Sequence, residues 1–86
     1  MSSQYETDVS IHEDFAERFK SIFSDLNNTQ IAEKLGLTHV AVQNYVKGRR
    51  LPTADVLMRI SNVTSVSIDW LLTGQGEQFL ATKVEF

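Results

Sequence analysis

The sequence contains no cysteine and only two histidines, His12 and His39, which lie far apart along the chain. The absence of cysteine excludes disulfide bonds and thiolate-bound metal ions. Two distant imidazoles are also too few for a structural zinc site, which takes four cysteine or histidine ligands. We therefore expect a fold held together by its hydrophobic core, with no metal and no other cofactor.

Long hydrophobic runs are absent as well. No apolar stretch approaches the roughly 18 residues that a membrane-spanning helix requires. The opening stretch, MSSQYETDVS, lacks the basic cluster and the apolar core of a secretory signal. The 86 residues, of which 42% are hydrophobic, suffice for one small globular domain. The sequence therefore predicts a cytoplasmic protein without a membrane partner.

Basic residues are few, and the formal net charge of −3 at pH 7 at first argues against nucleic acid as a partner. The charge is unevenly distributed, however. Residues 1–17 carry five acidic and no basic side chains, and residues 60–86 carry three acidic and one basic, whereas residues 18–59 carry seven basic and three acidic. Only charges within about 10 Å of a bound phosphate act strongly on it, so a basic middle segment is compatible with nucleic-acid binding.

Residues 11–26 show the apolar spacing of an amphipathic helix. Ser10 and Glu13 fit a capping box at its start. The residues before it have few large apolar side chains and no period, so we expect residues 1–10 to form a mobile acidic tail. The apolar face of the predicted helix consists of Phe15, Phe19, Ile22, Phe23 and Leu26.

Two short helices are predicted next. Asn27 is a suitable N-cap for a helix over 28–35, with Gln30 in the position that completes a capping box. Gly36 follows where a left-handed residue commonly ends a helix. Thr38 then caps a helix over 39–47, and Gly48 ends it.

Two further helices complete the predicted domain. Pro52 and Thr53 open a helix whose apolar face is Val56, Leu57, Ile60 and Val63. Ser67 caps a short helix, IDWLL, which ends at Thr73–Gly74. Leu71, Leu72 and Phe79 fit either a core or a dimer contact. We expect a compact all-α, five-helix domain over 11–74, with residues 75–86 as a C-terminal extension or linker.

Two helices joined by a short glycine-containing turn, here 28–35 and 39–47, form the helix-turn-helix unit. On a helical wheel at 100° per residue, the second helix divides into two separate arcs. Val42, Tyr45 and Val46 form the arc expected to face the core. The outward arc, about 140° wide, contains His39, Val40, Gln43, Asn44 and Lys47.

The outward arc has the chemistry of a DNA-reading surface. Gln43 and Asn44 can each form two hydrogen bonds with an adenine edge in the major groove, and Val40 can contact a thymine methyl. Cationic side chains such as Lys47 bind phosphates, which supply much of the affinity. The plain alternative for each residue is solvated helix surface, with Arg49–Arg50 as a solvated charge pair.

The stretches TQIAEKLGLTHVAVQNYVKG and SIDWLLTG resemble the helix-turn-helix domain of lambdoid phage CI-type repressors and the wider bacterial xenobiotic-response-element (XRE) group. Together the matches cover most of residues 11–76. The resemblance implies that the second helix of the unit reads operator half-sites and that a homodimer covers a near-palindrome. The predicted base-reading residues are His39, Val40, Gln43 and Asn44, and the predicted phosphate contacts are Asn28, Thr38, Lys47, Arg49 and Arg50.

We therefore predict a sequence-specific, dimeric transcriptional repressor that binds a double-stranded DNA operator. An antitoxin or a restriction-modification controller protein of the same fold is an alternative. A protein-interaction module that has lost DNA binding is another. The resemblance also leaves open a C-terminal oligomerisation domain in a longer protein. No spacing of Ser, His and Asp suggests a catalytic triad, so we expect no enzyme.

Overall fold

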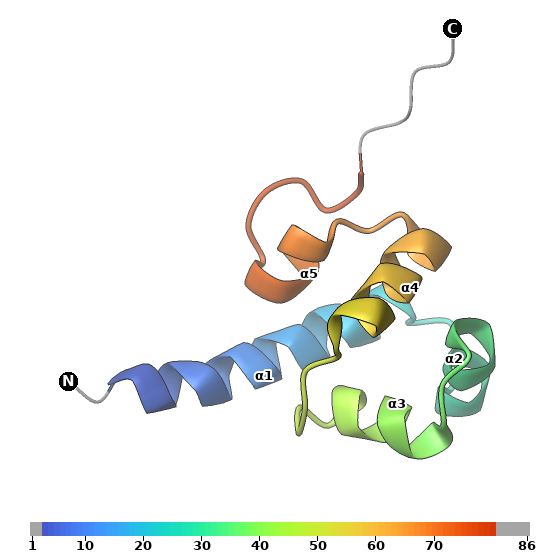
Figure 1. Ribbon diagram of the computed structural model, residues 1–86, viewed down its shortest axis with the longest axis horizontal. Coiled ribbons are helices and arrows are strands. Elements are labelled where there is room, and N and C mark those ends of the chain that lie inside the picture. Colours follow the sequence, from blue (N-terminus) through green and yellow to red (C-terminus); the bar gives the residue numbers. More distant parts are fainter. Residues whose placement is uncertain (1–2, 81–86) are drawn as a thin grey trace, which may run out of the picture.

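The computed structural model describes the backbone of residues 3–80 and the side chains of residues 11–80. These residues form five helices, which confirms the predicted all-α fold. The long helix α1 runs along the molecule, with α3 on one side of it and α5 on the other (Figure 1). The helices are α1 (Ser3–Ile22), α2 (Asn28–Leu35), α3 (His39–Val46), α4 (Ala54–Thr64) and α5 (Ile68–Thr73).

The predicted limits of the first helix are wrong. Because α1 begins at Ser3, Ser10 lies inside the helix, and a capping box of Ser10 and Glu13 does not start it. The helix continues towards the N-terminus because the segment contains no Gly or Pro to interrupt it, although it lacks an apolar period. The helix also ends at Ile22, and Leu26 donates its backbone N–H to the Phe23 carbonyl, 3.0 Å away, in the turn that follows.

Three phenylalanines of α1 form the centre of the core. Phe15 and Phe19 are fully buried, and Phe23 is 3% exposed. Their spacing places the three rings on one face of the helix. Tyr45 of α3 approaches this row from the side, with its ring centroid 6.3 Å from that of Phe15 and 5.9 Å from that of Phe19, both at a steep angle. Such edge-to-face packing joins α1 to α3.

Helix α4 contributes three of its four predicted core residues. Val56, Leu57 and Ile60 are buried, but Val63 is 41% exposed, so its assignment to the core is wrong. The chain leaves the helix two residues later through Ser65, which has a left-handed φ of 62°. Val66, 1% exposed, then fills the core beyond the end of the helix.

A short antiparallel pairing ties the chain after α5 to the chain before it. The backbone N–H of Ser67 donates to the Gln78 carbonyl, and that of Leu80 donates to the Ser65 carbonyl, both at 2.8 Å. Residues 78–80, in the predicted extension, are therefore hydrogen-bonded to the α4–α5 connection. Of the residues left open between core and dimer contact, Leu71 is buried, whereas Phe79 is 56% exposed.

Two arginines of the basic middle segment donate hydrogen bonds to backbone carbonyls at the ends of other helices. The Nε of Arg18 donates to the Leu71 carbonyl at 2.8 Å, and its Nη2 donates to the Leu72 carbonyl at 3.0 Å. Arg59 bonds two carbonyls at the end of α2, both through its Nη1. Carbonyls in the last turn of a helix lack partners within the helix and carry a partial negative charge, so a guanidinium suits them.

Candidate nucleic-acid interface

The first helix of the unit, α2, is fixed at both ends by its own sequence. The side-chain oxygen of Asn27 accepts from the Gln30 N–H at 2.8 Å, and the Gln30 side chain accepts from the Asn27 N–H at 2.9 Å. Gly36 has φ 67°, and the next residue, Leu37, donates its N–H to the Ala32 carbonyl at 2.9 Å. Both the predicted capping box and the left-handed glycine are confirmed.

Thr38 begins the second helix, α3, as predicted. Its hydroxyl oxygen accepts from the Ala41 N–H at 3.1 Å, which leaves the hydroxyl hydrogen available to donate outward. The helix ends at Val46, one residue earlier than predicted, and Gly48 turns the chain with φ 72°. A Cβ at Gly48 would lie 3.4 Å from the His12 carbonyl of α1, so the turn sits directly against α1.

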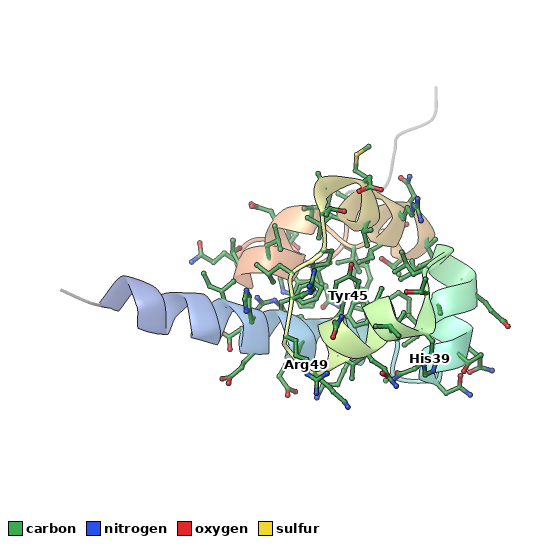
Figure 2. All side chains as sticks on the ribbon, turned by 60° about the horizontal axis from the view of Figure 1, so that its bottom comes forward. His39, Tyr45 and Arg49 are labelled. Carbon is green, nitrogen blue, oxygen red and sulfur yellow. The ribbon has the colours of Figure 1, made fainter. Side chains whose placement is uncertain are left out.

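Burial in α3 follows the predicted division of the helix into two arcs. Val42 is fully buried and Tyr45 is 8% exposed, whereas Val40 is 64% exposed. Figure 2 shows His39 and Arg49 along the outer edge of the molecule, with Tyr45 directed towards its body. Among the outward residues, His39 and Lys47 are exposed and Gln43 and Asn44 are partly exposed.

The polar groups of the outer arc are not engaged elsewhere within residues 11–80. In this range, the side-chain amides of Gln43 and Asn44 form no hydrogen bond, and Lys47, Arg49 and Arg50 form no ion pair. Burial raises the pKa of the Tyr45 phenol, although the positive charge of Arg50 opposes the shift. Among the side chains of residues 11–80, the amides of Gln43 and Asn44 and these three cations have no competing partner.

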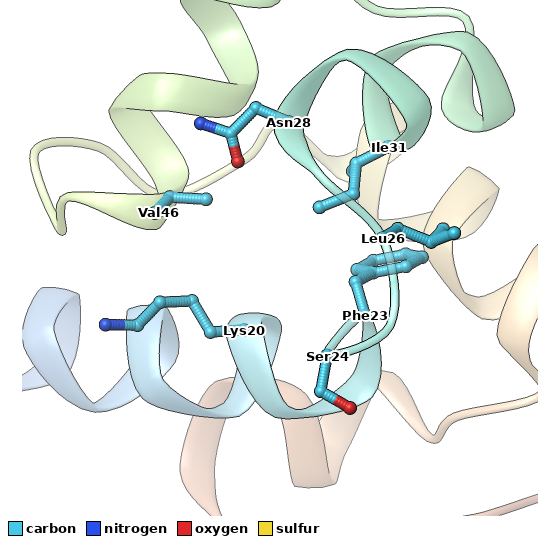
Figure 3. Close-up of a pocket in the computed structure, with 7 residues that line it drawn as sticks. All are labelled: Lys20, Phe23, Ser24, Leu26, Asn28, Ile31 and Val46. Atoms are coloured by element: carbon cyan, nitrogen blue, oxygen red, sulfur yellow. The ribbon is translucent and has the colours of Figure 1, made fainter.

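A hollow of about 220 Å³ lies between α1, α2 and α3 (Figure 3). Asn28 and Lys20 supply polar groups to it, and Figure 3 shows the Asn28 side chain reaching across it towards α3. The Lys20 ammonium lies 3.3 Å from the Glu17 carboxylate. Lys20 belongs to the last turn of α1, outside the helix-turn-helix segment. The lining residues are Lys20, Phe23, Ser24, Leu26, Asn28, Ile31 and Val46.

Other kinds of site find no support in the part of the chain that the structure describes. It contains no group of three His, Asp or Glu side chains placed to hold a metal ion. No helix between residues 3 and 80 is both long and apolar enough to cross a membrane. The exposed polar side chains of α3 and of its flanking residues make this face the candidate functional site.

Two short helices joined at a left-handed glycine, with a polar outer face on the second, define a helix-turn-helix protein. The family model described as Helix-turn-helix (HTH_3) matches residues 24–71, which contain α2, α3, α4 and most of α5. The chain belongs to this family, and the XRE and lambda-repressor-like resemblance is confirmed.

Two curated relatives match the chain. An uncharacterized HTH-type transcriptional regulator of Haemophilus influenzae is 36% identical over 64 residues, which are 73% of this chain and 27% of the relative. The uncharacterized HTH-type transcriptional regulator YqaE of Bacillus subtilis is 38% identical over 66 residues, which are 74% of this chain and 57% of the relative. The match thus spans about a quarter of one relative and just over half of the other. No solved structure matches the chain significantly.

Proposed function

We propose that the protein is a DNA-binding transcription regulator that places α3 in the major groove of an operator. The observation that carries this proposal is the outer arc of α3. The arc consists of exposed His39 and Val40 and of Gln43, Asn44 and Lys47, whose polar groups have no partner among the side chains of residues 11–80. The helix that carries them is capped at both ends. An α-helix fits the major groove, where amide side chains can read base edges.

The proposed contacts divide by chemistry. His39, Val40, Gln43 and Asn44 are assigned to bases. Phosphate contact is assigned to residues at helix starts and after α3, where backbone N–H groups and cations are available. This second group consists of Asn28, Thr38, Lys47, Arg49 and Arg50.

We further propose that the protein is a repressor of the phage CI type and acts as a homodimer that covers a near-palindromic operator. The names of both relatives describe them as transcriptional regulators, which supports a regulatory role. A bound dimer would occlude a promoter. Because both relatives are longer than their match, an additional oligomerisation domain in a longer protein is compatible with this proposal.

Selection of bound duplexes from a random pool tests the proposal. We expect enrichment of one sequence present as two inverted half-sites, about 10 base pairs from centre to centre or a multiple of that distance. Enrichment of a single unpaired half-site would contradict the homodimer but keep DNA reading. Failure to retain any duplex at low salt would contradict DNA binding and favour a protein-interaction module.

The Lys47→Ala variant tests the phosphate assignment. Loss of one phosphate contact removes about one released counterion, so we expect the slope of log affinity against log salt to become shallower by about 0.9. The loss should be similar for the selected site and for unrelated DNA, because phosphate contacts carry little sequence information. Affinities measured at four or more salt concentrations give the slope.

Lys34→Ala is the matched control for Lys47. Lys34 is an exposed lysine of α2, and it borders a different hollow with Leu26, Gln30 and Glu33. Its replacement should leave the slope unchanged. Equal slopes for the wild type and Lys47→Ala would remove Lys47 from the proposed interface.

A further inference from the structure

The side chain of Arg59, on α4, forms hydrogen bonds with the turn between α2 and α3. Its Nη1 donates to the Leu35 carbonyl at 3.3 Å and to the Gly36 carbonyl at 3.2 Å. The same nitrogen lies 3.6 Å from where a Cβ on Gly36 would be, so the guanidinium packs against the turn itself. This contact links a helix outside the proposed interface to the point from which α3 departs.

The N-terminal turn of α4 holds Arg59 in place. The Arg59 Nη2 lies 3.8 Å from the Asp55 carboxylate, one helical turn earlier. The Thr53 hydroxyl donates to that carboxylate at 2.6 Å, and this hydrogen bond lowers the pKa of Asp55. Thr53, Asp55 and Arg59 therefore form a chain of polar contacts from the start of α4 to the turn.

The turn controls the direction of α3. Only Gly36, Leu37 and Thr38 separate the two helices, so small dihedral changes there tilt α3 as a unit. A helix of eight residues is about 12 Å long, so a tilt of about 10° would move its far end by about 2 Å. Binding constellations tolerate only about 0.5 Å before they lose contacts.

We propose that Arg59 is a positioning residue for DNA reading: by bonding both carbonyls at the turn, it fixes the angle at which α3 meets the groove. Arg59 is not among the residues assigned to bases or phosphates. The inference rests on the proposed DNA-binding function. Tilting α3 would misplace Gln43 and Asn44 against base edges, while contacts with flexible cations such as Lys47 would adapt.

Arg18 provides a matched control within the same chain. It also bonds two carbonyls at a helix end, Leu71 at 2.8 Å and Leu72 at 3.0 Å, but these belong to α5. Replacing either arginine removes one positive charge and two hydrogen bonds. Only the Arg59 replacement releases the turn before α3.

The experiment compares Arg59→Ala, Arg59→Lys and Arg18→Ala at a temperature where circular dichroism shows each to be folded. The measured quantity is the ratio of affinity for the selected operator to affinity for an unrelated duplex. We expect Arg59→Ala to lower this ratio about tenfold, the cost of one misplaced base contact. Arg59→Lys keeps the charge but has one nitrogen where arginine uses two, Nη1 on the carbonyls and Nη2 beside Asp55, so it should lower the ratio by a smaller factor. Arg18→Ala should lower stability and leave the ratio unchanged.

Asp55→Asn gives a second test if Arg59→Ala does not fold. It leaves the arginine intact but removes the carboxylate beside it, and Asp55 is exposed. We expect a fall of the ratio by a few-fold, in the same direction as Arg59→Ala. An unchanged ratio in the folded Arg59 and Asp55 variants, or an equal fall in Arg18→Ala, would overturn the positioning role while leaving the proposed function intact. A wild-type protein without any sequence preference would overturn both.

Discussion

A variant with both Gln43 and Asn44 replaced by alanine is expected to keep its fold and to lose most of its preference for its selected site over unrelated DNA. Each amide can make two hydrogen bonds with a base edge, and each such pair contributes about 1–3 kcal/mol of discrimination. Together they account for about 2–6 kcal/mol, a large part of the specificity of a single site. Alanine favours helix, so α3 should remain intact.

Affinities for the selected duplex and for a scrambled duplex, measured in the same salt, check this prediction. Asn62→Ala is the matched control, because Asn62 is an exposed amide on α4, outside the helix-turn-helix unit. It should change neither affinity. If the double variant retains the full preference for the selected site, α3 does not read bases through its amides, and the outer arc is solvated surface.

The Phe19→Ala variant is expected to lose about 3–5 kcal/mol of its free energy of unfolding, because truncating a buried phenylalanine leaves a cavity. Phe19 is fully buried, and its ring centroid lies 5.6 Å from that of Phe15, 5.1 Å from that of Phe23 and 5.9 Å from that of Tyr45. Small domains have only about 5–15 kcal/mol in total. The variant should therefore lose a large part of its stability and unfold at a lower urea concentration than the wild type.

Urea denaturation followed by circular dichroism measures this loss. Phe79→Ala is a control of the same chemistry, because Phe79 is 56% exposed and most of its ring already contacts water. Exposed substitutions of this kind change stability by about 0.5 kcal/mol or less. Similar losses for the two variants would show that the Phe15, Phe19 and Phe23 row is not the centre of the core.

Local features of the fold could be predicted from the sequence because their chemistry spans only three or four residues. The Asn27–Gln30 capping box, the Thr38 and Ser67 caps and the left-handed Gly36 all appear in the structure. The division of α3 into two arcs was equally accessible, because a helix fixes the relative directions of its own side chains. These features define the candidate site.

Features that depend on distant residues could not be predicted in this way. Arg18 and Arg59 belong to the basic middle segment, yet each bonds carbonyls at the end of another helix. Arg18 lies 53 residues along the chain from Leu71, and Arg59 lies 23 residues from Gly36. Val63 fits the apolar period of α4 but is exposed, and the buried valine is Val66, which follows the end of the helix. Which residues bind bases or phosphates also depends on a partner, so those assignments remain predictions.

The protein carries a single tryptophan, and its position determines what intrinsic fluorescence can report. Trp70 is partly buried in α5 and packs against the core cluster. In Figure 1, α5 lies across α1 from α3. Tryptophan emission is therefore a local reporter of whether α5 stays docked on α1.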